Sequence, residues 1–198
     1  MADQEQNELA GAKTQKLRAV RSPAQTDNTQ FNTDQERIRE MIAAGTPLSE
    51  ILSQLVLMIE AQSPEMLGSI LLLSDDGNHV KHAVAPSLPE SYVKVIDGSP
   101  IGPKHGSCGT AMFRGKPVIV SDIFVDPLWE DYRQYAEAIG MRACWSTPIL
   151  SSKGKVLGSF AMYYREPRTP DGQERYLTDA ATKLAAEAIE HSRRIKQS

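Results

Sequence analysis

Apolar and polar positions along the chain follow two periods, one helical and one extended. Apolar residues spaced three and four apart, together with helix start and stop residues, predict helices at residues 34–44, 47–63, 89–96, 110–114, 126–139 and 171–195. Short apolar runs bounded by turn residues predict β-strands at residues 66–73, 79–85, 117–120, 142–150 and 155–164. The turn sequences SDDGN and SSKG join two pairs of these runs into hairpins. This order of elements predicts an α+β domain with an antiparallel sheet.

Residues that favour helix ends mark the first and last helices. Thr33 and Glu36 have the spacing of a capping box, in which each side chain accepts a hydrogen bond from an unpaired backbone amide, so the first helix is expected to start there. Gly45 would end that helix, because glycine tolerates a positive φ. The pair Asp171 and Glu174 marks the start of the last helix, whose final turns carry basic residues that oppose the negative end of the helix dipole.

The composition indicates one globular domain behind a polar arm. Residues 1–32 are polar and have no sustained period, which predicts a flexible arm before a domain at residues 33–198. The net charge of -3 argues against nucleic acid as a partner, because phosphate binding needs a basic face. No apolar run approaches the roughly 18 residues that cross a membrane, and the N-terminus lacks a signal-peptide core. Two cysteines are too few for a disulfide framework, so we expect a cytoplasmic protein.

Three segments in the second half carry a family resemblance. They read GSCGTAMFRGKPVIVSDI, DPLWEDYRQYAEAIGMRACWSTPIL and GKVLGSFAMYYREPR, in that order. With the hairpin before them they resemble the GAF family, and more narrowly the GAF domains of bacterial sensor kinases and cyclic-di-nucleotide signalling enzymes. The resemblance covers about residues 45–195. It implies a central antiparallel sheet with terminal helices on one face and a small-ligand pocket on the other.

The resemblance also implies a function. GAF modules of this kind are non-catalytic sensors of bacterial signal transduction, in which a bound small molecule shifts the terminal helices. The apolar stripes of those helices suit a homodimer that would regulate a partner kinase or output domain. A purely structural dimerisation module, with its pocket filled by its own side chains, is a further reading of the same pattern.

Candidate ligand contacts lie in the glycine-rich loop and among the aromatic residues. Glycines at residues 98–109 would let backbone amides approach a ligand, and the helix start that follows carries a partial positive charge that suits an anion. The same loop would also serve as a structural lid. Tryptophan and tyrosine combine an apolar body with a polar group that can orient a ligand. The candidate ligand-binding residues are Ile101, His105, Cys108, Trp129, Tyr132, Trp145, Thr147 and Tyr163.

Cys108 supports an alternative function. A helix start lowers the pKa of a thiol, and the sequence GSCGTA resembles the corresponding loop of free methionine-R-sulfoxide reductases, which are GAF-fold enzymes that use cysteine thiols. In that reading Cys108 is the catalytic residue. The reductases rely on further cysteines in set positions, whereas the other cysteine here, Cys144, falls in a predicted strand where we do not expect a resolving thiol. Free cysteines are also common small core residues, so we favour the sensor.

The pattern does not indicate a metal or a cofactor. The histidines have no metal-ligand spacing, and neither HExxH nor CxxC occurs. A haem pocket would need an axial histidine, for which His105 is the candidate, and a bilin pocket would need a cysteine within its own motif. Resemblance to stand-alone GAF proteins that sense nitrate makes an oxyanion such as nitrate the first ligand to test.

Overall fold

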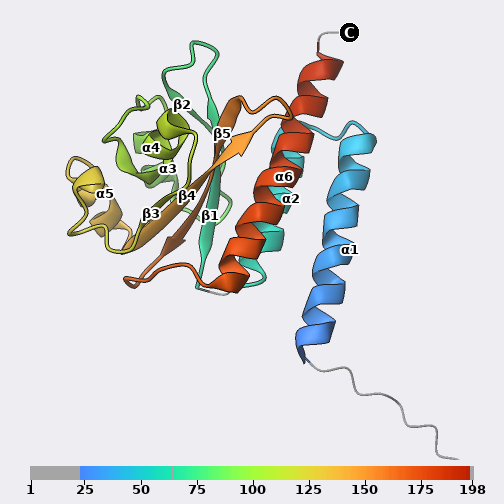
Figure 1. The fold of residues 1–198 in the computed structure, drawn as a ribbon, viewed down its shortest axis with the longest axis horizontal. Coiled ribbons are helices and arrows are strands. Elements are labelled where there is room, and N and C mark those ends of the chain that lie inside the picture. The colour runs from blue at the N-terminus through green and yellow to red at the C-terminus, as the bar shows by residue number, and fades with distance from the viewer. Residues whose placement is uncertain (1–22, 64, 197–198) are drawn as a thin grey trace, which may run out of the picture.

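A five-stranded antiparallel sheet forms the centre of the structure, a computed structural model that describes residues 23–63 and 65–196 (Figure 1). The strands lie in the order β2 (Val80–Val84), β1 (Leu67–Leu73), β5 (Val156–Tyr164), β4 (Ala143–Leu150) and β3 (Val118–Val120). Every neighbouring pair is antiparallel. The two predicted hairpins are confirmed as β1–β2 and β4–β5, and β5 lies at the middle of the sheet.

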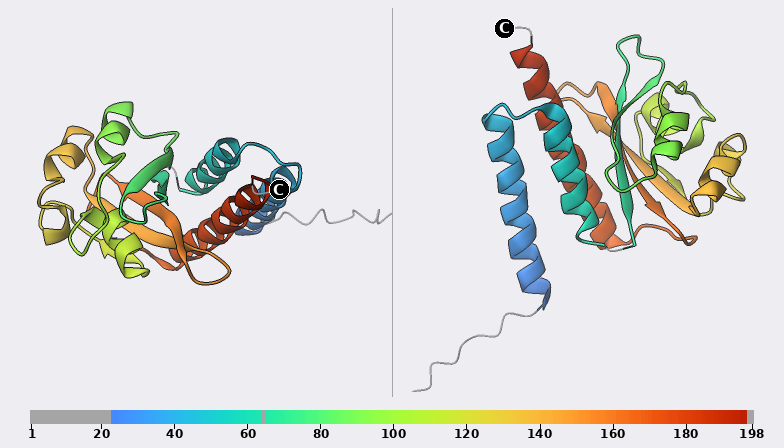
Figure 2. Two further views of the ribbon diagram at one scale, coloured as in Figure 1. Left: turned by 90° about the horizontal axis from the view of Figure 1, so that it is seen from above. Right: turned by 180° about the vertical axis from the view of Figure 1, so that it is seen from behind.

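The helices divide between the two faces of the sheet. On one face lie α2 (Leu48–Glu60) and α6 (Gly172–Ile195), with α1 (Pro23–Ala43) along their outer side (Figures 1 and 2). On the other face lie α3 (Glu90–Ile96), α4 (Gly106–Arg114), the 3-10 helix η1 (Pro127–Trp129) and α5 (Arg133–Ala138). This segregation confirms the predicted α+β class. Among the described residues, no helix has both the length and the apolarity that crossing a bilayer requires.

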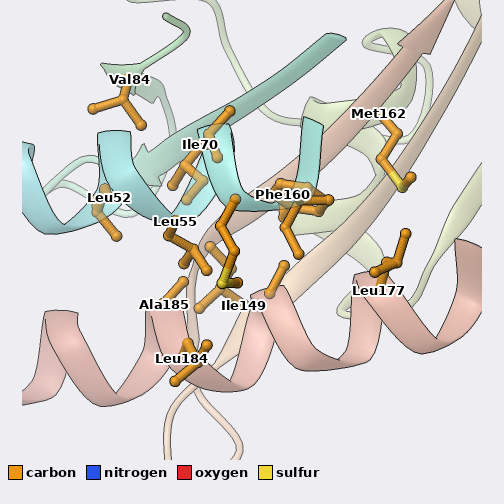
Figure 3. Packing of buried hydrophobic residues seen from close by; sticks show 14 of the residues in the cluster. Leu52, Leu55, Ile70, Val84, Ile149, Phe160, Met162, Leu177, Leu184 and Ala185 are labelled. Atoms are coloured by element: carbon orange, nitrogen blue, oxygen red, sulfur yellow. The ribbon is translucent and has the colours of Figure 1, made fainter. Parts of the chain in front are cut away.

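The larger hydrophobic core fills the space between the sheet and the helices α2 and α6. Figure 3 shows side chains from both helices and from the sheet pointing into it. Leu55 on α2, Phe160 on β5 and Leu184 on α6 have no solvent exposure. Full burial of such side chains contributes about 1.5–3 kcal/mol each, so this core holds the helical layer on the sheet. A smaller core covers the opposite face and surrounds Tyr163.

Helix α1 begins earlier than the sequence pattern indicated. The prediction of a helix start at Thr33 is wrong, because α1 already begins at Pro23. Thr33 therefore lies inside the helix, where its hydroxyl donates to the carbonyl oxygen of Thr29 at 3.0 Å and does not cap a helix end. The part of the predicted flexible arm that spans residues 1–22 lies outside the described residues.

Tertiary packing explains the longer helix. Phe31 is 2% exposed, and its ring centroid lies 5.8 Å from that of Tyr176 on α6. Ile38 and Ile42 continue the same buried stripe. A single apolar residue in a polar segment gives little periodic signal, yet its burial against α6 stabilises a helix of low intrinsic preference.

Two shorter helices also differ from the prediction. The expected helix at residues 126–139 is divided into η1 and α5, and Asp126 caps η1 by accepting a hydrogen bond from the backbone amide of Leu128 at 2.8 Å. Helix α4 begins at Gly106 and not at residue 110. The glycine-rich loop is therefore shorter than expected, and Cys108 lies in the first turn of a helix.

A buried carboxylate ties the start of α6 to the sheet. Glu174 is 4% exposed, and its Oε1 accepts hydrogen bonds from the hydroxyl of Tyr164 and from Nη2 of Arg168, both at 2.7 Å. Its Oε2 accepts from the backbone amide of Asp171, which completes a capping box. The Arg168 backbone carbonyl accepts a hydrogen bond from Nε1 of Trp145. One side chain thus joins β5, the loop before α6 and α6 itself.

We expect Glu174→Ala to lower the free energy of unfolding by about 2 kcal/mol, because it removes the acceptor of the buried Tyr164 hydroxyl and one partner of the partly exposed Arg168 guanidinium. Urea denaturation measures the change. Glu187→Ala on the same helix is the matched control, since Glu187 is about half exposed and pairs with Arg39 at 3.6 Å; its effect should stay within about 0.5 kcal/mol. Equal effects of the two substitutions would contradict this role of Glu174.

Candidate functional site

A cavity of about 40 Å³ lies on the sheet face opposite α2 and α6. Five aromatic side chains form one wall, and the first turn of α4 closes another side. The aromatic wall consists of Tyr92 on α3, Trp129 on η1, Tyr132, Tyr135 on α5 and Tyr163 on β5. The α4 side consists of residues 105–109, and Leu71, Val80, Ile96, Ser99 and Pro100 complete the lining. The cavity is therefore small, mostly apolar and bounded by seven different helices and strands of one domain.

The first residue of α4 needs a backbone conformation that favours glycine. Gly106 has a φ of 58°, and a Cβ atom placed on it would lie 3.9 Å from both the Trp129 and the Tyr132 rings. At Gly109 a Cβ atom would meet the Pro100 carbonyl oxygen at 3.2 Å, which is a tight contact. These two glycines let the first turn of α4 pack closely against the aromatic wall and against Pro100.

We expect Gly106→Ala to lower the free energy of unfolding by about 1–2 kcal/mol, because the left-handed conformation is strained for alanine although space for the methyl group exists. Thermal or urea denaturation provides the measurement. Gly172→Ala is the control, since Gly172 also begins a helix but has an ordinary φ and open space around it. A Gly106→Ala protein as stable as the control would show that the φ at this position is not constrained.

A chain of hydrogen bonds holds the aromatic wall, α4 and the sheet together. Trp129 donates from Nε1 to the Ser107 hydroxyl oxygen at 2.9 Å, and the Ser107 hydroxyl donates to the Cys144 carbonyl oxygen at 3.0 Å. Both Trp129 and Ser107 are buried. The Trp129 ring also packs edge-on against Tyr132, with 6.4 Å between centroids. The position of η1 is therefore fixed relative to β4 through a single serine.

Polar groups gather where α4 meets the sheet. Cys108 Sγ lies 3.8 Å from the Tyr163 hydroxyl, which is hydrogen-bonded at 3.2 Å to the hydroxyl of Ser69. Burial raises the pKa of Tyr163, so its hydroxyl remains protonated. The hydroxyls of Ser146 and Ser159 are buried and, within the described structure, have no hydrogen-bond partner at ordinary distance. This polar group contrasts with the apolar remainder of the cavity wall.

The two cysteines are free thiols with different environments. The pKa of Cys108 is lowered, chiefly by the neighbouring Cys144 thiol and further by the nearby hydroxyls of Ser146, Tyr163 and Ser159, while burial opposes the shift. The pKa of Cys144 is raised, mainly because this side chain is fully buried. Cys108 is therefore the more readily ionised thiol, and it is also the one that lines the cavity.

The structure brings together five of the eight candidate ligand-binding residues. His105, Cys108, Trp129, Tyr132 and Tyr163 all line the cavity. Ile101 lies beside it, in the small apolar cluster that also contains Cys108, and is not part of the wall. Tyr135, which is not among the eight candidates, is also a wall residue.

Trp145 and Thr147 do not face the cavity, and the expectation that they would is wrong. Trp145 belongs to the core beneath α2 and α6, and Thr147 is paired with Phe160 of that same core. Successive strand residues point to opposite faces, so the inward position of Cys144 directs Trp145 to the helical side. Almost all of β4 is buried, so its sequence does not alternate between polar and apolar residues. The sequence therefore does not show which residues face the cavity and which face the helices.

Sequence reasoning missed Tyr92 and the serines. Tyr92 is 4% exposed and packs edge-on against Tyr163, with 5.9 Å between centroids. It lies in a short helix with no distinctive motif, so no local signal marked it. Ser146 would have been found with the correct phase of β4, since it follows Cys144 by two residues on the same face.

The fold and the cavity define the class of α+β domains that enclose a small cavity on the sheet face opposite their terminal helices. The chain belongs to one family of this class, the GAF domain, whose family model matches residues 46–190. This confirms the resemblance read from the sequence.

The chain is similar to a named sensor. It is 40% identical over 157 residues to the methyl sulfide methyltransferase-associated sensor of Methanosarcina acetivorans, a match that covers 79% of this chain and 16% of the relative. The chain thus spans about a sixth of the length of that relative.

Two solved structures show how widely the fold is shared. A domain of a two-component sensor histidine kinase from Sinorhizobium meliloti has a TM-score of 0.63 and 18% identity, covering 77% of this chain and 99% of that one. The free methionine-R-sulfoxide reductase of Neisseria meningitidis, in complex with its substrate, also has a TM-score of 0.63, with 17% identity over 84% of this chain and 92% of that one. At these identities both structures support the fold alone.

Proposed function

We propose that this GAF domain is a non-catalytic sensor module that binds a small molecule in the cavity and passes its occupancy to the terminal helices. The observation that carries the proposal is the arrangement of two neighbouring tyrosines on β5. Tyr163 forms part of the cavity wall, while Tyr164 points to the other face and donates a hydrogen bond to Glu174 on α6. A displacement of β5 by a ligand would therefore act directly on the helix.

The cavity lining restricts the class of ligand. Among the lining residues of the described structure there is no lysine or arginine, and His105 is the single residue that can carry a positive charge. An oxyanion such as nitrate would depend on the partial charge of the α4 start and on the Tyr163 hydroxyl. The aromatic wall favours a small, largely apolar molecule with one polar group. Because the named relative is associated with a methyl sulfide methyltransferase, small methylated sulfides belong in the same screen as nitrate.

The two tryptophans provide a direct test, because they lie on opposite faces of the sheet. A ligand in the cavity should change the emission of Trp129 and leave that of Trp145 nearly unchanged. We expect the ligand-dependent signal to persist in Trp145→Phe and to vanish in Trp129→Phe, with saturable binding in titrations of nitrate, amino acids, nucleotides and methylated sulfides. A bound ligand at about 100 times its Kd would also raise stability by about 2.7 kcal/mol.

Failure of every compound to bind the wild-type protein would contradict the sensor proposal. A signal that persists in Trp129→Phe and disappears in Trp145→Phe would place the ligand on the helical face. A sensor also has no turnover, so methionine sulfoxide should remain unreduced in the presence of dithiothreitol; its reduction would favour the reductase alternative.

The output is proposed to run through a homodimer to a kinase or another output domain in the cytoplasm. Exposed apolar side chains on the helical layer support an interface, among them Leu57 on α2 at 41% exposure and Tyr176 on α6 at 48%. The free thiols fit a reducing compartment. The similarity to a domain of a sensor histidine kinase supports a linked output.

Light scattering tests the dimer. We expect a mass of twice the 21.8 kDa of the chain at micromolar concentration, and a shift toward the monomer in Leu57→Glu, because a charge would replace an apolar contact. Ile119→Glu on the edge strand β3 is the control, since Ile119 is also 41% exposed but lies away from the helical layer. A monomeric wild type would contradict the homodimer without affecting ligand binding.

A further inference from the structure

We propose that Cys108 and Cys144 form a reversible disulfide at the floor of the cavity, so that the module responds to oxidants as well as to a bound ligand. The proposal concerns a modification of the protein itself. It therefore does not depend on the identity of the ligand, nor on whether a ligand binds at all.

The geometry brings both thiols to one point on the sheet. Cys144 on β4 is the direct partner of Tyr163 on β5, so the two side chains stand next to each other on the cavity face. Cys108 on α4 reaches the same place from above, with its Sγ 3.8 Å from the Tyr163 hydroxyl. The hydrogen bond from Ser107 to the Cys144 carbonyl oxygen holds this turn of α4 against β4. Cys144 and Tyr163 belong to one buried cluster, and Cys108 packs against that cluster.

The two cysteines differ in the way that a two-step oxidation requires. Cys108 is partly exposed and lines the cavity, so a small oxidant can reach it. Nearby hydroxyls lower the pKa of its thiol, and two of them, those of Ser146 and Ser159, are buried without a hydrogen-bond partner among the described residues. Cys144 is fully buried and has a raised pKa, so it is inert toward solvent and can react only with a group beside it.

The chemistry balances with a hydroperoxide as the oxidant. The Cys108 thiolate attacks one peroxide oxygen, a sulfur–oxygen bond forms, the oxygen–oxygen bond breaks, and the departing alkoxide or hydroxide takes up the proton that Cys108 lost. This step yields a sulfenic acid on Cys108. The sulfur of Cys144 then attacks the Cys108 sulfur, the sulfur–oxygen bond breaks, and hydroxide leaves with the Cys144 proton as water. The two thiols supply the two electrons that reduce the peroxide, and a dithiol reductant reverses the change.

The new bond would act on the cavity wall. It would join the first turn of α4 covalently to β4 beside Ser107, the residue that positions Trp129. Any shift of α4 toward the sheet would therefore also move the tryptophan. Oxidation and ligand binding would then both act on the positions of α4 and η1. Two events that act on the same elements are energetically coupled.

The test treats the full chain with hydrogen peroxide and measures thiols and mass. Because the sequence contains two cysteines, every lost thiol is assigned to this pair. We expect both thiols to disappear together, a mass lower by about 2 Da, an unchanged oligomeric state in the absence of reductant, and full recovery with dithiothreitol. Peptide mapping should find the Cys108 and Cys144 peptides linked. In Cys144→Ser, Cys108 should instead accumulate as a sulfenic acid that dimedone traps.

Three outcomes would overturn the proposal. In the first, Cys108 of the wild-type protein reacts with dimedone while Cys144 remains a thiol. In the second, the disulfide forms between two chains. In the third, no thiols are lost at a peroxide excess that oxidises a free cysteine peptide. These results come from the wild-type protein, so they hold even if Cys144→Ser fails to fold. Ser152→Ala, at an exposed serine in the β4–β5 turn, is the control for Ser146→Ala, which should slow the oxidation of Cys108 because it removes a buried hydroxyl that lowers the pKa of that thiol.

Discussion

The central strand β5 is buried on both faces, and this constraint organises the structure. Every residue from Leu157 to Tyr164 is shielded from solvent. Alternate side chains therefore belong to two different cores, one beneath α2 and α6 and one around the cavity. Such a strand cannot shift for one core without disturbing the other, because both are close-packed. Gly158 shows how tight the arrangement is, since a Cβ atom there would collide with the Leu71 backbone carbonyl.

The same constraint explains which parts of the structure were predictable. Helices and strands with one solvent-exposed face have a periodic pattern of apolar residues. For this reason α2, α6 and both hairpins were predicted close to their observed bounds. The sequence did not show which residues of β4 face the cavity, because both faces of the strand are buried, and this is why Trp145 and Thr147 were placed on the wrong side. The start of α1 was missed for a different reason. Its stability comes from the contact between Phe31 and Tyr176, and residues so distant in sequence leave no local pattern.

The candidate site shows a similar division. Tyr163 and Cys108 could be found from their residue types and from the glycines around them, whereas Tyr92 could not. The neighbourhood of Cys108 depended on the fold most strongly of all. From the sequence, Cys144 is a strand residue far from any reactive group, but the pairing of β4 with β5 and the packing of α4 bring it next to Cys108. The sequence alone therefore left Cys108 without a neighbouring thiol, because strand pairing and helix packing cannot be derived from it.

The buried carboxylate of Glu174 has a mechanical consequence. It fixes the first turn of α6 at three points, whereas the far end of the helix is tied by an exposed hydrogen bond between Ser152 and Glu190. At 1.5 Å per residue, the 24 residues of α6 form a rod about 36 Å long. A tilt of about 5° at the fixed end would move the last turn by about 3 Å, by the geometry of a rod of that length. The fixed end of α6 lies across the sheet from the cavity, where Glu174 accepts the hydrogen bond of Tyr164.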